Sequence, residues 1–254
     1  MRENASGPQS VRVRDVTLLH AARRFAQSRG LDVSRFPGDH PTHHVVQLLR
    51  HHGIARVLDV GANDGGYASE LRRFGYTGRI VSFEPVSEPY RLLGKRASHD
   101  ADWMTLPYAV GAESAKVTIN VAANNAASSS VLPMLATHEE AAPSAMIVGA
   151  EKVTQRALDG LWPDITEPDD LVFLKADVQG YERQVLDGVA EHLDRITGLQ
   201  LELSMVPLYE GGWLYDEALD WARQQGFVLM RLIPGFTDPR TGQMLQADGV
   251  FFRG

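Results

Sequence analysis

The sequence contains no cysteine in its 254 residues. That absence excludes disulfide bridges, thiolate catalysis and zinc sites built on cysteine. No apolar run approaches the roughly 18 residues that a membrane-spanning helix needs, and the polar start MRENASGPQS lacks the apolar core of a secretory signal. We therefore expect a protein of a reducing compartment, the cytoplasm, without a membrane partner.

Basic residues are also few. The chain has 25 Lys and Arg against 32 Asp and Glu, a formal net charge of -7. Nucleic-acid binders usually carry a basic face, so this balance predicts no nucleic-acid partner. The hydrophobic fraction of 44% is ordinary for a globular chain with a large core, and the length suits one α/β domain with an extension.

The first part of the chain, residues 1–53, is predicted to be an N-terminal helical extension. Apolar residues recur at helical spacing in 16–29 and in 43–52. Four histidines lie in or beside the second of these segments, and we interpret them as a solvated helix face. The role of this extension, and whether the chain forms a homo-oligomer, stay open.

Residues 54–254 are predicted to form the catalytic domain. Short apolar strands alternate there with helices, which predicts a mostly parallel sheet with helices on both faces. The predicted strands are 56–60, 79–83, 103–110, 116–121, 153–158, 171–176, 198–203, 227–233 and 249–253. No helix separates the last two, so the final strand is predicted to be antiparallel. The segment 122–150 has no firm periodicity, and we expect a lid or acceptor loop there because long loops are often functional.

The first strand runs into VLDVGANDGGYA, a glycine-containing turn between a strand and a helix. Glycine lets the backbone approach a ligand closely, and the N-terminus of a helix offers free N–H groups. The turn therefore predicts cofactor binding, although an ordinary βα turn also favours Gly and Asp. The predicted contacts are Asp59, Gly61, Ala62, Asn63, Gly65 and Tyr67, of which Tyr67 is equally suited to the core.

The second strand ends in VSFEP, which places Glu84 23 positions after Gly61. An acidic residue there accepts hydrogen bonds from ribose hydroxyls, so we expect a ribose-containing cofactor held by Glu84, with Pro85 beside it. The nicotinamide fingerprint G-x-G-x-x-G fails because Asn63 stands at its second glycine, and the P-loop pattern is absent. A D-x-G-x-x-x-G pattern remains.

Four segments together resemble the FkbM family of class I methyltransferases: VLDVGANDGGY, VSFEPVSEPYRLL, YAVG at 108–111, and FLKADVQGYERQVLDG. The resemblance covers residues 56–210. It implies a Rossmann-like fold with a seven-stranded sheet, S-adenosylmethionine as methyl donor, and a small-molecule hydroxyl acceptor such as a sugar or another natural product. It also implies that Ala109, at the end of the third strand, contacts the adenine. The extension and 122–150 match no part of the family pattern, so the acceptor stays unidentified.

Three further residues are candidates for catalysis. Asp177 follows the apolar strand LVFLKA at the carboxyl end, where α/β sites lie. It is predicted to touch the cofactor and to act as general base, orient the acceptor or hold a metal; the alternative is a helix cap. Lys175 lies on the same strand face and, because a lysine in an apolar strand needs a partner, is expected to pair with Glu182.

Glu202 ends the next strand and is the second candidate base. With Asp177 it offers oxygen ligands for Mg²⁺; alternatively, one of the two carboxyls has a raised pKa. The metal assignment stays unknown. His138, within 122–150, is the third candidate, because histidine titrates near neutral pH.

Two rivals from other classes remain: a nicotinamide-dependent oxidoreductase and a non-catalytic nucleotide-binding module. The failed fingerprint and the lack of a Tyr-x-x-x-Lys pair disfavour the first. The retained acidic residues Asp59, Glu84 and Asp177 disfavour the second. A nucleic-acid methyltransferase is disfavoured by the acidic charge balance and by the absence of an N-P-P-Y pattern after LVFLKA.

Overall fold

The computed structural model describes residues 23–31, 36 and 38–254. The chain divides into two compact units, Met1–His40 and Pro41–Gly254. In the first unit residues 23–27 are helical, and the earlier part of the helix predicted at 16–29 lies outside the described residues. Among the described residues, no helix combines the length and apolarity needed to cross a membrane.

The helix predicted at 43–52 is α2 (Pro41–His51), and it belongs to the second unit. Its residues Val45, Val46 and Leu49 are buried in that unit's core. The division of the chain therefore lies before α2, earlier than the boundary predicted after residue 53, because the apolar face of α2 packs with the sheet domain.

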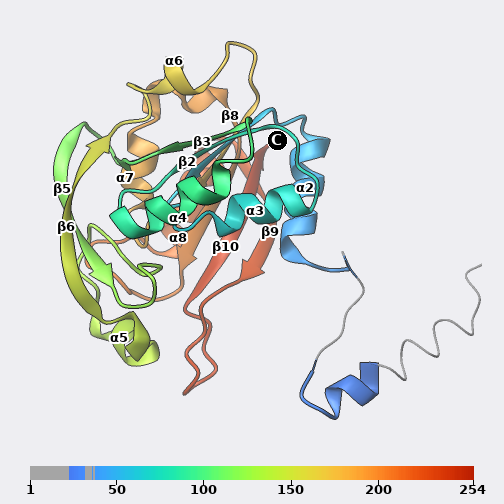
Figure 1. The fold of residues 1–254 in the computed structure, drawn as a ribbon, viewed down its shortest axis with the longest axis vertical. Coiled ribbons are helices and arrows are strands. Elements are labelled where there is room, and N and C mark those ends of the chain that lie inside the picture. The colour runs from blue at the N-terminus through green and yellow to red at the C-terminus, as the bar shows by residue number, and fades with distance from the viewer. Residues whose placement is uncertain (1–22, 32–35, 37) are drawn as a thin grey trace, which may run out of the picture. The chain divides into compact units, whose positions relative to one another are not determined.

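A seven-stranded sheet forms the centre of the second unit (Figure 1), in the order β3-β2-β1-β7-β8-β10-β9. Its strands are β1 (Arg56–Val60), β2 (Arg79–Phe83), β3 (Trp103–Leu106), β7 (Val172–Ala176), β8 (Ile196–Ser204), β9 (Phe227–Pro234) and β10 (Gln246–Arg253). The first five pair in parallel. The last strand, β10, lies between β8 and β9 and is antiparallel to both, as predicted.

Helices cover both faces of this sheet, so two separate hydrophobic cores form. The first face packs against α2, α3 (Gly66–Arg73) and α4 (Ser87–Ala97). The other face packs against α6 (Trp162–Ile165), α7 (Glu182–Asp187) and α8 (Tyr215–Gln224). Every residue of the neighbouring strands β1 and β7 is buried, which explains why both are continuous apolar runs with few polar residues.

A second, three-stranded sheet has the order β4-β6-β5, from β4 (Ala109–Val110), β5 (Ala115–Ala122) and β6 (Ile147–Arg156). Figure 1 shows β5 and β6 as a curved ribbon beside the main sheet. The strand predicted at 103–110 is therefore wrong as a single element, because its end leaves the main sheet as β4. The unstructured loop predicted at 122–150 is also wrong, since β6 begins at Ile147 and α5 (Ala136–Ala141) lies between the strands.

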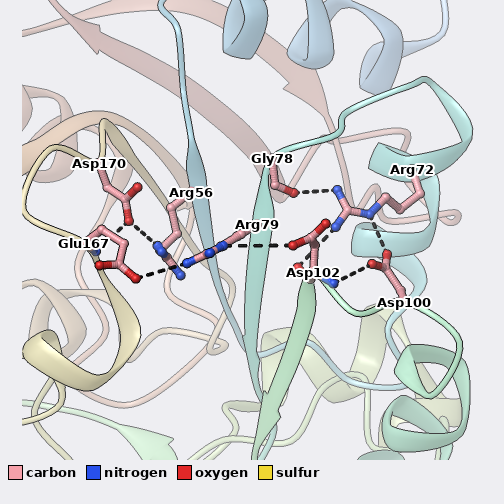
Figure 2. Close-up of polar contacts among 8 residues, drawn as sticks. All are labelled: Arg56, Arg72, Gly78, Arg79, Asp100, Asp102, Glu167 and Asp170. Carbon is pink, nitrogen blue, oxygen red and sulfur yellow. Dashed lines mark hydrogen bonds and ion pairs between the residues drawn. The ribbon is translucent and has the colours of Figure 1, made fainter.

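Ion pairs hold the amino ends of the parallel strands, as Figure 2 shows. Arg56 is the first residue of β1, and its guanidinium pairs with Asp170, which lies just before β7. Both side chains are largely buried. Arg79 at the start of β2 lies 3.1 Å from Glu167 and 4.0 Å from Asp102, but these side chains are exposed and contribute little. None of these arginine–carboxylate pairs lies at the opposite, carboxyl edge of the sheet, where the cavity opens.

Candidate active site

A cavity of about 340 Å³ lies at the carboxyl ends of β1, β2, β7 and β8. Its walls come from the turn after β1, from β4 in the second sheet, and from the residues after β7. Part of the predicted lid also contributes, because residues 126, 127 and 129–131 line the cavity. The volume is within the range of small-molecule sites, roughly 300–1,000 Å³.

The turn after β1 depends on Gly61, whose φ is +77°. A Cβ atom there would lie 1.8 Å from the carbonyl oxygen of Asp177, so only glycine lets the ends of β1 and β7 approach this closely. Gly65 has a different role from the predicted cofactor contact. Its Cβ would meet Leu93 of α4 at 2.9 Å, so Gly65 allows helix packing, and its neighbour Gly66 lines the cavity instead.

Ala62, Asn63 and Tyr67 line the cavity at the same turn, as predicted from the glycine pattern. Asn63 has a left-handed backbone, φ 48°, and its side-chain amide donates to the carbonyl oxygen of Asn125 at 3.1 Å. This bond joins the cofactor turn to the 126–131 side of the cavity.

Glu84 lies at the carboxyl end of β2, and both Glu84 and Pro85 line the cavity. The carboxylate accepts the backbone N–H of Asn63 at 2.8 Å and that of Val86 at 2.7 Å. Burial raises the pKa of Glu84 to about 7, although both N–H groups oppose the shift. A carboxylate has about four lone-pair positions, so two remain for hydroxyl donors. The site fits the ribose of S-adenosylmethionine.

The wall next to Glu84 is apolar. Ala109 lines the cavity with Val86, Tyr108 and Ile119, and three of these four belong to the small core beneath the second sheet. Ala109 is thus at the site, as the family resemblance implied, but on β4 and not at the end of β3. A flat apolar wall beside a ribose-binding carboxylate fits an adenine ring.

Asp59 is completely buried and does not line the cavity. Its carboxylate accepts the hydroxyl of Ser82 at 3.1 Å, and the Nζ atom of Lys175 lies 3.4 Å from its other oxygen. Burial raises the pKa of Asp59, and the charge of Lys175 opposes that shift. Asp59 therefore does not lie where the predicted cofactor contact would be made. Its carboxylate instead pairs with Lys175, which does line the cavity.

Lys175 lies between Asp59 and Asp177, 3.3 Å from the latter, and 5.0 Å from the ring centre of Tyr67. Burial would lower the pKa of Lys175, but these carboxylates outweigh burial and raise it above its usual range. Lys175 is therefore a fixed cation. The predicted pairing with Glu182 is wrong, because that carboxylate accepts the backbone N–H groups of Val178 and Gly180.

Three carboxyl groups gather where β7, β8 and β10 meet. Asp177 lines the cavity and is about one-third exposed. Asp248 lines it as well, because the antiparallel register places Asp248 opposite Glu202. Burial and the charge of Asp177 raise the pKa of Asp248 to about 6. The sequence reading missed Asp248, and the available signal was an aspartate inside the apolar strand QADGVFF.

Glu202, the second candidate base, does not line the cavity. Burial and the charge of Asp177 raise its pKa well above the usual range. The side-chain amide of Gln179 lies between the two, donating to Asp177 at 3.0 Å and to Glu202 at 2.8 Å. An amide therefore bridges the pair that was considered for Mg²⁺, and among the described residues no three His, Cys, Asp or Glu side chains, these carboxyls included, are placed so that they could hold one metal ion.

His138 is 2% exposed and does not line the cavity. It lies on α5, with its ring 5.2 Å from the rings of Tyr209 and Phe236, and burial lowers its pKa. The prediction of His138 as a base is wrong, because His138 lies on the apolar face of α5 and packs with a small core beside the site.

A comparison with curated proteins finds no match. Solved structures resemble the chain at low identity. They include a 1,6-didemethyltoxoflavin N1-methyltransferase from Burkholderia thailandensis (11% identity, TM-score 0.43, 98% of this chain and 94% of that one). Others are an rRNA methylase from Streptococcus thermophilus (12%, 0.45, 87% and 98%) and a methyltransferase from Aquifex aeolicus (14%, 0.40, 81% and 88%).

The sequence model of the methyltransferase FkbM domain matches residues 59–229. The match begins at Asp59 and includes the glycine turn, Glu84, the second sheet and the Lys175–Asp177 region, so it covers the residues that line the cavity except Asp248. This match to a methyltransferase family excludes the alternative of a nicotinamide-dependent oxidoreductase. The chain belongs to the FkbM family of S-adenosylmethionine-dependent methyltransferases.

Proposed function

We propose that this protein transfers a methyl group to a hydroxyl oxygen of a small molecule, with sugars and other natural-product hydroxyls as the acceptor class. The observation that carries the proposal is the position of Asp177: a partly exposed carboxylate at the cavity wall, held from two sides by Lys175 and Gln179. Oxygen acceptors need a base for the hydroxyl proton. Bound S-adenosylmethionine supplies an electrophilic methyl group on a sulfonium centre, which is itself a good leaving group.

Asp177 accepts the proton of the acceptor hydroxyl in this scheme. Lys175 keeps the carboxylate oriented through the ion pair at 3.3 Å. Glu84 binds the ribose, and the turn at Gly61 brings the ends of β1 and β7 together so that both groups face one cavity. Positioning of this kind accounts for several kcal/mol of a reaction barrier.

The charges around the cavity favour an uncharged acceptor. Carboxylates line it at Asp64, Glu84, Asp177 and Asp248, whereas Lys175 is the one cationic side chain among the described lining residues. That lysine is already paired with two carboxylates. A phosphate or carboxylate on the acceptor would find no free cation, which supports a neutral hydroxyl compound. We keep magnesium out of the scheme.

Calorimetric titration with S-adenosylhomocysteine tests the cofactor assignment first. Wild-type protein should bind it, Glu84→Ala should bind at least tenfold more weakly, and NADH should give no binding. Equal affinity for S-adenosylhomocysteine in Glu84→Ala and wild-type protein would contradict the ribose role of Glu84. A wild-type protein that binds the cofactor but turns over none of a panel of neutral hydroxyl acceptors would support the non-catalytic module instead.

The base is tested with Asp177→Asn and, as a matched control on the same wall, Asp248→Asn. General-base catalysis contributes about 10²–10⁴-fold to a rate. We expect kcat to fall by that factor in Asp177→Asn, with S-adenosylhomocysteine affinity within about threefold of wild type. A larger loss of kcat in Asp248→Asn than in Asp177→Asn would instead assign the general base to Asp248 on β10.

A cytoplasmic location is proposed on the sequence evidence alone, as is the absence of a nucleic-acid partner. The supporting observations are the lack of cysteine and the net charge of -7. We also propose that the protein forms a homo-oligomer, and sedimentation velocity measures its oligomeric state directly.

A further inference from the structure

Gln179 has an unusual backbone for its residue type. Its φ is 58°, in the left-handed region, which is unfavourable for a residue that carries a side chain. Such a conformation persists only when the surroundings hold it in place, and these positions gather at functional sites. Gln179 lies two residues after Asp177, is 8% exposed, and lines the cavity.

The side chain of Gln179 uses both ends of its amide. The nitrogen donates to the carboxylates of Asp177 and Glu202, and the oxygen accepts the hydroxyl of Tyr209 at 2.8 Å. The backbone carbonyl of the same residue accepts the hydroxyl of Ser130 at 2.8 Å. One residue therefore contacts the proposed base on one side and the cavity-lining segment 126–131 on the other.

Tyr209 adds a second connection to that segment. Its hydroxyl lies 3.0 Å from the carbonyl oxygen of Ser128, as well as near Gln179. The ring is 2% exposed and packs closely on Gly180, where an added Cβ would lie 2.9 Å from the Cβ of Tyr209. Since a phenol has one proton, Ser128 and Gln179 share it, so this hydroxyl joins the segment to the amide.

We propose that Gln179 and Tyr209 form a latch that couples the position of segment 126–131 to the orientation of Asp177. When the segment lies over the cavity, Tyr209 and Ser130 hold Gln179, and the amide of Gln179 holds the carboxylate of Asp177. When the segment moves away, the backbone carbonyl of Gln179 loses Ser130 and the hydroxyl of Tyr209 loses Ser128, so fewer contacts hold Gln179 and its amide releases Asp177. Gln179 and Tyr209 are thus positioning residues, and the catalytic meaning of the latch rests on the proposed role of Asp177.

Hydrogen exchange tests the latch without any acceptor. Tyr209→Phe removes one hydroxyl and keeps the ring that packs on Gly180. We expect amide exchange in peptides covering 126–131 to become on the order of 3–10-fold faster, the equivalent of one hydrogen bond, while peptides from β1 and β7 stay at the wild-type rate. The control is Tyr215→Phe, since Tyr215 is 42% exposed at the start of α8.

The coupling to Asp177 is read by carboxyl ¹³C NMR at fixed pH, with the Asp177 signal identified by its loss in Asp177→Asn. A latch predicts that this signal shifts in Gln179→Leu and also in Tyr209→Phe, although Tyr209 does not touch Asp177.

Unchanged exchange in Tyr209→Phe, or an Asp177 signal that does not move in Tyr209→Phe, would each overturn the latch. If Gln179→Leu fails to fold, Gln179→Asn, with the shorter amide, provides the same comparison. Failure of the proposed function is distinguishable, because it appears as absent cofactor binding or absent turnover in wild-type protein, whereas the exchange and NMR measurements use the protein without either ligand.

Discussion

Replacing Gly61 by alanine should damage both the fold and the site, and the structure allows the size of the effect to be worked out. The backbone of Gly61 has φ +77°, which costs a non-glycine residue roughly 1–2 kcal/mol. The added Cβ would lie 1.8 Å from the carbonyl oxygen and 2.8 Å from the carbonyl carbon of Asp177. Because both atoms are backbone, β1 and β7 must separate to relieve the contact.

Overpacking of this kind costs about 1–3 kcal/mol, so the two terms together destabilise the protein by about 2–5 kcal/mol. For a chain of this size each kcal/mol lowers Tm by roughly 2–4 °C, and the expected loss is on the order of 10 °C. S-adenosylhomocysteine affinity should fall as well, since the separation moves Asp177 and the turn residues away from one another.

The matched control is Gly94→Ala, inside α4, where an added Cβ meets nothing within 4 Å. A helical glycine replaced by alanine gains about 0.5–1 kcal/mol. Urea unfolding and thermal melting of the three proteins give the comparison, and calorimetry gives the affinities. A Gly61→Ala protein within about 0.5 kcal/mol of wild type, with intact cofactor affinity, would refute the close approach of β1 and β7.

Three other expectations follow from the buried charges. Since folding raises the pKa of Glu84 from 4.5 to about 7, the folded state holds the proton more tightly; stability of the ligand-free protein should therefore fall as pH rises from about 4.5 to 7, and urea titrations should show a flatter profile for Glu84→Gln. Lys175→Met leaves Asp59 buried without its cation and should destabilise by about 3–5 kcal/mol, with much of the loss recovered in the double variant with Asp59→Asn. His138→Leu should keep kcat within about twofold of wild type in a steady-state assay, because the ring lies outside the cavity.

The sequence predicted the central elements well because their patterns are local. β1 and β2 begin and end at the predicted residues, and β7 differs by one residue. Each is a short, largely buried segment bounded by turn residues, and burial on both faces makes such strands continuous in sequence. The glycine turn and Glu84 were found for the same reason, since their spacing is set by one βαβ unit.

The second sheet was only partly predicted, because its pairings are distant. The strand expected at 116–121 is β5 within one residue at each end, but β6 begins at Ile147 and not at 153, and Ala115 on β5 pairs with Gln155 on β6, 40 positions later. Asp248 was missed for a related reason: only the antiparallel register with Glu202 brings it to the cavity. The partner of Lys175 was misassigned because Asp59 reaches it across a strand pairing, 116 positions earlier in the chain.

The small core beneath the second sheet has a consequence for how the protein can be rebuilt. Val86, Ala109, Ile119 and Val153 form it apart from the two cores that hold the main sheet. The wall assigned to the adenine ring is therefore stabilised by its own contacts, while the ribose carboxylate and the glycine turn belong to the main frame. A chimera that exchanges β5, β6 and their connection with those of a relative would change this wall and the segment 126–131 together, and leave Glu84 and the glycine turn in place.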